Sequence, residues 1–188
     1  MPILGIMASQ ISGHLWAPAG AYDALATITL SSSVSSVTFT GIPSGYKHLQ
    51  IRGICRDTRA DVSNSNAVRF NGDTAANYSA HLLYGDGTSA YSAGLPNETQ
   101  ADLFTSASAS SASNIFGVFV MDILDYANTN KFKTTRTLSG FDRNGGGQVN
   151  LSSGNWRNTA AITSIDIRPL YGSPQYVQYS SFALYGVK

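Results

Sequence analysis

The fold is indicated most clearly by the stretch Val37-Thr-Phe-Thr-Gly-Ile-Pro-Ser-Gly-Tyr-Lys-His-Leu-Gln-Ile-Arg-Gly-Ile-Cys-Arg56. Apolar and polar residues alternate in its first part, and they alternate again beyond the central turn. This period of two is typical of half-buried β-strands. The segment Gly41-Ile-Pro-Ser-Gly45 supplies the turn, because proline presets φ and glycine accepts positive φ. The stretch therefore predicts a strand, a tight turn and a longer strand, paired as a hairpin.

The same pattern continues to the end of the chain. Further strands are expected at residues 24–30, 68–70, 78–84, 115–124, 131–141, 148–151, 162–168 and 176–187, with a weak one near 99–104. No window of useful length shows a helical period. About ten strands separated by turn residues predict an all-β fold: a single antiparallel β-sandwich, jelly-roll-like.

The middle of the chain is expected to be rich in loops, from residue 88 to residue 114. Residues 105–114 are almost entirely serine and alanine, a composition that predicts a mobile surface loop. No internal repeat and no domain boundary follow residue 20. We therefore expect one sandwich domain over residues 21–188.

Residues 1–20 stand apart as an N-terminal arm or lid. Their apolar side chains follow no clean period, and Ala17-Pro-Ala-Gly20 then breaks the chain. One interpretation is a lid on the domain's own core, and the other is an arm that docks on a neighbouring subunit, since an exposed apolar arm needs a partner. The predicted contact residues on this arm are Ile3, Leu4, Ile6, Leu15 and Trp16.

Composition excludes several classes of partner. Charged residues make up 12% of the chain and the net charge is +1, so no basic stripe exists to neutralise phosphates and nucleic acid is not an expected partner. No apolar run reaches the roughly 18 residues of a membrane span, and the N-terminus lacks the basic start of a signal peptide. We expect a protein made in the cytoplasm whose neutral surface suits sugar contacts or packing against other protein.

Catalytic chemistry is not indicated. The three histidines are His14, His48 and His81, and none lies in a nucleophile-elbow motif. Carboxylate pairs are scarce, and the Asn- and Asp-rich turns lack the spacing of a calcium-binding EF-hand loop. Cys55, the single cysteine, lies in phase with the apolar residues of its strand and is interpreted as a small buried side chain. The sequence therefore predicts no enzyme, no cofactor and no metal site.

Aromatic residues offer the clearest sites of contact outside the arm. Tyr171-Gly-Ser-Pro-Gln-Tyr176 is the most loop-like aromatic group in the chain. Tyrosine rings in loops can stack on sugars or anchor an interface. Tyr171 and Tyr176 are therefore predicted as partner-binding residues.

Several phrases carry a resemblance over nearly the whole chain. They include Phe39-Thr-Gly-Ile-Pro-Ser-Gly-Tyr-Lys-His-Leu-Gln-Ile-Arg52, His81-Leu-Leu-Tyr-Gly-Asp-Gly87, Asp122-Ile-Leu-Asp-Tyr-Ala-Asn-Thr-Asn-Lys131 and Gln178-Tyr-Ser-Ser-Phe-Ala-Leu-Tyr-Gly186. The chain resembles small β-rich virion structural proteins of tailed bacteriophages, a group that includes capsid decoration (cement) and tail-fibre-associated proteins. The resemblance implies a part of the virion and brings no catalytic residues.

The expected function is that of a capsid decoration protein at the virion surface. Its partners would be the major capsid protein and copies of itself, as a homotrimer. The chain is too short for a long fibre shaft, which favours the capsid over the tail. The alternative is a small tail-fibre or baseplate tip domain that binds host-surface glycans through loops 88–114 and 171–176.

Overall fold

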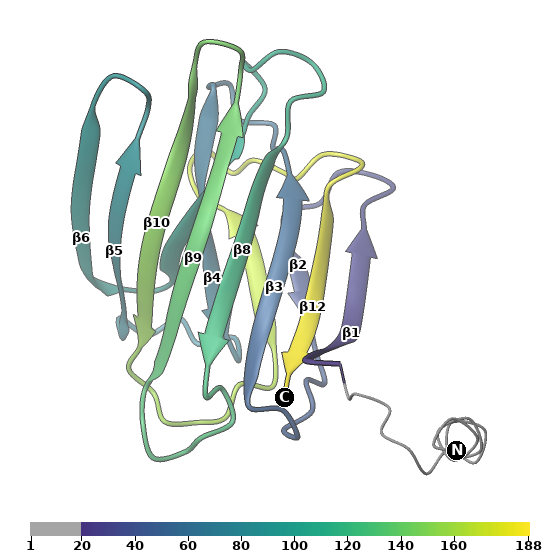
Figure 1. The fold of residues 1–188 in the computed structure, drawn as a ribbon, viewed down its shortest axis with the longest axis vertical. Coiled ribbons are helices and arrows are strands. Elements are labelled where there is room, and N and C mark those ends of the chain that lie inside the picture. Colours follow the sequence, from purple (N-terminus) through teal and green to yellow (C-terminus); the bar gives the residue numbers. More distant parts are fainter. Residues whose placement is uncertain (1–19) are drawn as a thin grey trace, which may run out of the picture.

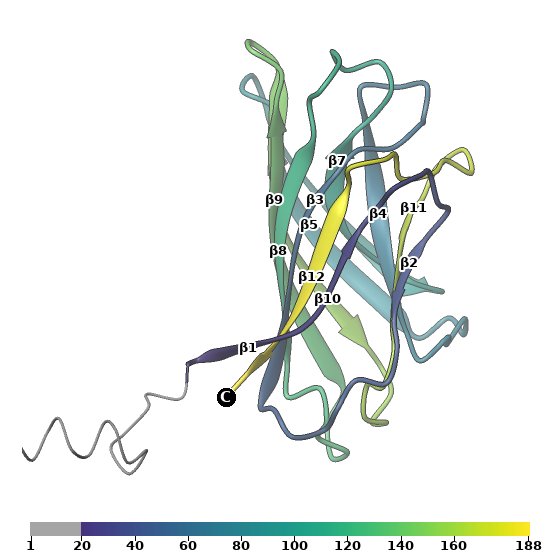
Figure 2. The ribbon, with the colours of Figure 1, turned by 90° about the vertical axis from the view of Figure 1, so that its right-hand side faces the viewer.

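A computed structural model of the chain describes residues 20–188 as a sandwich of two antiparallel β-sheets (Figures 1 and 2). The prediction of an all-β sandwich is confirmed, and the jelly-roll subtype stays a prediction. The described residues form twelve strands: β1 (Tyr22–Thr29), β2 (Val37–Phe39), β3 (His48–Cys55), β4 (Ser63–Phe70), β5 (Tyr78–Gly85), β6 (Ala90–Glu98), β7 (Ala101–Ala107), β8 (Gly117–Leu124), β9 (Lys133–Asp142), β10 (Gly147–Trp156), β11 (Ile165–Pro169) and β12 (Ser181–Val187).

The two layers differ in size. The larger sheet has eight strands in the order β1-β12-β3-β8-β9-β10-β5-β6, and the smaller has four in the order β2-β11-β4-β7. Figure 1 looks onto the larger sheet, with β5 and β6 at one side, and Figure 2 shows the smaller sheet packed behind it. Strand β7, the edge of the smaller sheet, packs against β9, β10 and β5 of the larger one.

The predicted hairpin at residues 37–56 is wrong in its pairing. Both strands exist, but β2 pairs with β11 in the smaller sheet, whereas β3 pairs with β12 and β8 in the larger sheet. The turn between them crosses from one layer to the other. Ile42 is buried and its N–H donates to the carbonyl oxygen of Thr163, while the Tyr126 hydroxyl donates to the Pro43 carbonyl. Local alternation reveals the strands but not their partners, which lie far away in sequence.

The predicted loop-rich middle contains two strands, β6 and β7. Every residue of β7 is buried, so the expectation of a mobile loop over residues 105–114 is wrong for its first three residues. Beyond β7, the guanidinium of Arg56 donates hydrogen bonds of 2.8–3.2 Å to four carbonyl oxygens, those of Ala109, Ser111, Ala112 and Ile115. This Ser/Ala-rich segment is therefore held largely by one arginine, together with the Ser111 hydroxyl, which donates to the Val62 carbonyl at 2.7 Å.

Aromatic side chains fill the space between the sheets. Phe119 of the larger sheet stacks on Phe104 of the smaller one with ring centroids 3.9 Å apart, and Phe182 packs beside it. The Phe119 ring also lies directly over Gly53, its partner on β3. A Cβ atom built on Gly53 would come within 2.3 Å of this ring, so the close packing requires a residue without a side chain.

We predict that Gly53→Ala lowers the free energy of unfolding by about 1–3 kcal/mol, because the added methyl group displaces the Phe119 ring from its stack on Phe104. Gly45→Ala is the matched control, since a Cβ there meets nothing within 4 Å. Urea unfolding followed by intrinsic fluorescence measures both variants. Equal stability of the two variants would contradict the packing argument.

Candidate interaction surface

The outer face of the larger sheet carries a continuous apolar surface, which we call the apolar face. Each of its side chains is at least 40% exposed, although all lie on regular strands. Its members come from five neighbouring strands: Leu83, Leu151, Val149, Leu138, Val120, Val118 and Ile54. At about 4.8 Å between neighbouring strands, they span roughly 19 Å across the sheet.

Strand register places these side chains in two adjacent rows. In one row Leu83 pairs with Leu151, Leu151 with Leu138, and Leu138 with Val120. In the next row Val149 and Val118 flank Gly140, and Val118 pairs with Ile54 of β3. Directly opposed side chains in antiparallel strands lie close enough to touch, so each row is continuous apart from the gap at Gly140.

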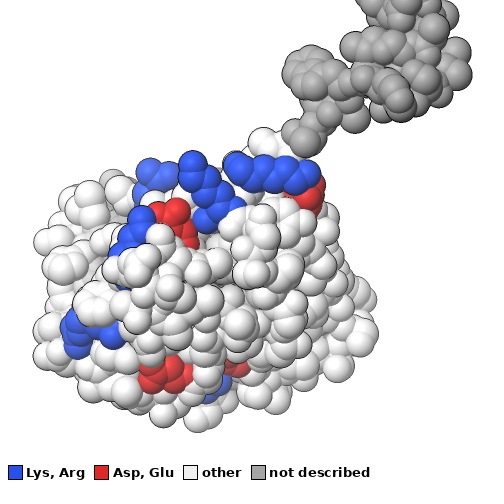
Figure 3. All heavy atoms as spheres, turned by 90° about the horizontal axis from the view of Figure 1, so that it is seen from below, with Lys and Arg blue, Asp and Glu red and all other residues white. Residues whose placement is uncertain are grey.

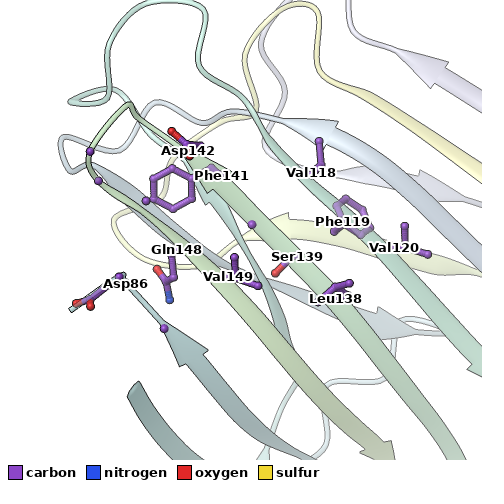
Figure 4. A pocket seen from close by; sticks show the side chains of 16 residues that line it. Asp86, Val118, Phe119, Val120, Leu138, Ser139, Phe141, Asp142, Gln148 and Val149 are labelled. Carbon is purple, nitrogen blue, oxygen red and sulfur yellow. The ribbon is translucent and has the colours of Figure 1, made fainter. Parts of the chain in front are cut away.

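A hollow of about 800 Å³ lies at this gap. Figure 4 shows Val118 and Val120 from β8, Leu138 from β9 and Val149 from β10 gathered along one side of it. The glycine-rich turns at residues 85–87 and 145–147 form its other border. The apolar face is therefore a surface with a depression into which a protruding side chain can fit.

A chain of polar side chains borders the apolar face on the next row of the sheet. Arg136 donates to Asp122 at 3.1 Å, Gln50 donates to the other Asp122 oxygen at 2.8 Å, and the Arg52 Nε donates to Gln50 at 2.7 Å. The Arg52 guanidinium then lies 5.2 Å from the centre of the Tyr185 ring. The border thus runs across four neighbouring strands, β9, β8, β3 and β12, and each of its polar side chains contacts the next one.

Charges beyond this border gather at the end of the sandwich where β12 ends. Lys188 pairs with Asp23 at 2.8 Å, and Lys131 pairs with Asp125. Figure 3 views the molecule from that end: Lys and Arg lie near the start of the described chain, and most of the remaining visible surface is uncharged. The apolar face lies away from this group, towards the β9–β10 turn.

An apolar centre with a polar border is the composition of a protein–protein interface rather than of a free surface. The pattern in β8 supports this interpretation. Phe119, Met121 and Ile123 fill the core, whereas Val118 and Val120 point outward and are apolar too. Strands that are apolar on both faces are typical of sheets covered on both faces. The smaller sheet covers only one.

The predicted contact residues fall in three different places. Ile3, Leu4, Ile6, Leu15 and Trp16 lie outside the described residues, as does the predicted arm except for Gly20. Tyr171 is 53% exposed in the loop after β11. Tyr176 does not fit a role in contact, because it is fully buried and its hydroxyl donates to Asn66 at 2.7 Å. Neither Tyr171 nor Tyr176 lies on the apolar face.

Groups that could serve catalysis lie apart from one another. His48 contacts Asp125 at the end of the sheet, and His81 lies on β5. Burial raises the pKa of the Cys55 thiol far above its usual range, and this agrees with its interpretation as a buried side chain. Within residues 20–188 no three His, Cys, Asp or Glu side chains gather into a metal site, and no helix could cross a membrane.

Comparison with protein-family models, with curated proteins and with solved structures finds no match for this chain. The interpretation of its surfaces therefore depends on its own geometry. Sequence reasoning missed the apolar face, although a signal existed. The run at residues 115–124 is nearly continuous in apolar residues, more than one buried face requires.

Tyr171 lies at a second concave region, a polar cavity of about 230 Å³ on the inner side of the larger sheet. Asp102 of β7 lines this cavity and is 7% exposed. Burial raises the pKa of its carboxyl to about 7, against the opposing effect of a hydrogen bond from Ser65, and the charge of Glu98 adds to the rise. At neutral pH this carboxyl therefore lies close to its titration midpoint.

We predict that the native protein binds a hydrophobic dye such as ANS at the apolar face, and that Leu138→Lys reduces the dye fluorescence at least threefold. Leu138 is 56% exposed, so a lysine there changes the surface and leaves the core unchanged. Thr134→Lys on the same strand and the same side, but outside the face, is the control. A dye signal that falls equally in both variants, or in neither, would contradict this assignment.

We predict that the free energy of unfolding falls by roughly 2–4 kcal/mol between pH 4 and pH 8 through Asp102. The folded protein keeps this proton up to about pH 7, whereas the unfolded chain releases it near pH 4. Folding is therefore progressively disfavoured as the pH rises through that window. Denaturant unfolding at pH 5 and pH 8 measures the fall. Asp102→Asn should abolish it, and Asp61→Asn, in the same cavity but partly exposed, should retain it.

Proposed function

We propose that this protein is a structural component of a tailed-bacteriophage virion, a decoration (cement) protein that binds the assembled capsid shell through the apolar face. The observation that supports this most directly is the apolar face itself: seven exposed apolar side chains in register, with a fixed polar border. The resemblance of the sequence to phage virion proteins supplies the kind of assembly.

The partner that we propose for the apolar face is the major capsid protein. The seven side chains of the face are uncharged, and Asp86 and Asp142 lie on the lining of the hollow at Gly140. The face therefore suits an apolar surface whose projecting side chain enters the hollow. A stable interface needs about 800 Å² on each partner, whereas a face roughly 19 Å wide and about 14 Å deep, the depth of two rows, covers well under half of that area. The proposal therefore includes further contacts from residues 1–20 and between the three copies of a homotrimer.

The mechanism is thermodynamic linkage between binding of this protein and stability of the assembled shell. A protein that binds only the assembled shell lowers the free energy of that state and leaves free subunits unaffected, so the shell resists heat and pressure better when the sites are filled. No catalytic group, cofactor, membrane or nucleic acid takes part. The protein acts at the virion surface after its synthesis in the host cytoplasm.

The alternative proposal is a small tail-fibre or baseplate tip domain that binds host-surface glycans. The exposed Tyr171 beside the polar cavity favours it. Copy number distinguishes the two positions. Hundreds of copies per virion indicate the capsid, and a few dozen or fewer indicate the tail.

We predict that Leu138→Lys lowers binding to undecorated shells at least tenfold, because a buried interface centre does not accommodate an unpaired charge. Thr134→Lys should bind like the native protein. Deletion of residues 1–20 should also abolish binding while the sandwich stays folded. Co-sedimentation with shells measures occupancy, and circular dichroism confirms folding. Full occupancy by the Leu138 variant would overturn the role of the face, and full occupancy by the deletion would overturn that of the arm.

A further inference from the structure

The polar cavity beside Tyr171 lies on the opposite side of the larger sheet from the apolar face. Strand β10 separates the two: Val149 and Leu151 point outward to the apolar face, whereas Asn150 lines the cavity. Gln148, near the start of the strand, borders both the cavity and the hollow at Gly140. Its other walls come from β4, β5, β7 and the loop after β11. The cavity is thus a corner where the edge strand β7 of the smaller sheet meets the larger sheet.

Two buried asparagine side chains line this cavity, and in each of them one of the two polar atoms of the amide group has no hydrogen-bond partner among the described residues. Asn64 is 2% exposed; its Oδ1 accepts hydrogen bonds from Arg59 and from the Tyr171 N–H, and its Nδ2 has no acceptor among the described residues. Asn150 is 5% exposed; its Nδ2 donates to the Thr105 hydroxyl at 2.6 Å, and its Oδ1 has no donor within the described part of the chain. An unpaired buried polar group costs about 1–3 kcal/mol in general, so each one needs an explanation, and a bound molecule that supplies the missing partner is one.

These two atoms specify the chemistry of an occupant. Asn64 offers a donor, Asn150 offers an acceptor, and the Asp102 carboxyl adds further acceptor capacity. A hydroxyl group can both donate and accept, so a molecule with several hydroxyls satisfies all three positions.

Charge in the cavity disfavours an anion. Arg59 is the only cationic side chain among its lining residues, and it is already engaged by Asp61 at 3.3 Å and by Asn64 at 3.1 Å. The acidic groups Asp61 and Asp102 line the same space, and Glu98 is near enough to raise the pKa of Asp102. A phosphate or carboxylate would therefore meet negative charge with no free partner.

Aromatic rings complete the site. The Tyr171 ring has the Arg59 guanidinium 5.4 Å from its centre and is half exposed at the cavity. Tyr84 also lines the cavity, and it stacks on the exposed Tyr91 with ring centroids 4.8 Å apart. Such rings offer flat apolar surface beside polar groups, which suits a ring with both C–H faces and hydroxyl edges.

We propose that the polar cavity binds a single neutral pyranose unit, free or at the end of a glycan, with its hydroxyls on Asn64, Asn150 and Asp102 and its C–H face on Tyr171. The volume of about 230 Å³ is below the roughly 300–1,000 Å³ of pockets for drug-sized ligands, so one ring fits and a chain does not. This site is independent of the apolar face and of the position of the protein on a virion.

The test uses the purified full-length protein and a panel of methyl pyranosides: glucoside, galactoside, mannoside, fucoside and the two N-acetylhexosaminides. Saturation-transfer NMR at about 10 mM sugar detects binding with Kd values near 1 mM. We expect transfer to the ring protons of at least one sugar, and none to methyl phosphate or methylammonium. Transfer to an ion but to no sugar, or to none of the compounds, would overturn the proposal.

Two variants and one control locate the site and separate an effect on binding from an effect on folding. Tyr171→Ala should weaken sugar binding at least tenfold, whereas Tyr179→Ala, which removes another exposed ring from the same loop region outside the cavity, should bind normally. Asp102→Asn should also weaken binding at least tenfold, although we expect it to stabilise the fold at pH 8. Equal loss in the two tyrosine variants, or native affinity in Asp102→Asn, would contradict the assignment. None of these outcomes depends on binding to shells.

Discussion

The crossing of the chain between β2 and β3 is the constraint on which the rest of the sandwich depends. Residues 40–47 leave the smaller sheet and enter the larger one, fixed by the hydrogen bonds of Ile42 to Thr163 and of Tyr126 to Pro43. Because β3 does not pair with β2, its two neighbours come from distant parts of the chain, β12 on one side and β8 on the other. The central part of the larger sheet therefore joins segments from near the start, the middle and the end of the described chain.

Polarity is distributed unevenly across the larger sheet. In β9 the inward residues Lys133, Thr135, Thr137 and Ser139 are buried and polar, whereas Leu138 points outward. The Lys133 ammonium is held by the carbonyl oxygens of Asn128, Lys131 and Thr159. Folding alone favours the reverse arrangement, with leucine inside and threonine outside. An apolar residue on the outside of such a strand is best explained by a partner that covers it.

The sequence predicts the elements of this fold better than their arrangement. Alternation at Val37–Phe39 and at Leu49–Cys55 depends on local geometry alone, so both strands could be identified. Their partners are distant in sequence: β2 pairs with β11 and β3 with β12, in each case more than 100 positions away, and no local pattern encodes these contacts. The strand β7 was underestimated because Thr105, Ser106 and Ala107 have a composition typical of loops, although buried bonds to Asn150 and Asp57 hold them.

The candidate sites show the same difference between local features, which could be predicted, and distant contacts, which could not. Tyr171 could be predicted, since an exposed aromatic residue in a Gly-Pro loop needs only local information. Tyr176, five residues later, has the same loop-like setting, and its burial follows from distant partners, Val34 for the backbone and Asn66 for the hydroxyl. The apolar face could not be assembled from sequence, because its rows join residues of five strands whose order is not sequential.

The two proposed surfaces are compatible because one strand separates them. Along β10 the side chains alternate, so that Val149 and Leu151 contribute to the outer side, and Asn150 to the inner side. A protein seated on a shell by the apolar face would therefore turn the polar cavity away from that shell and leave it open to solvent. A substitution of an outward residue of β10 therefore has a matched control in the substitution of an adjacent inward residue. The two positions share the same strand backbone, but each faces a different proposed ligand.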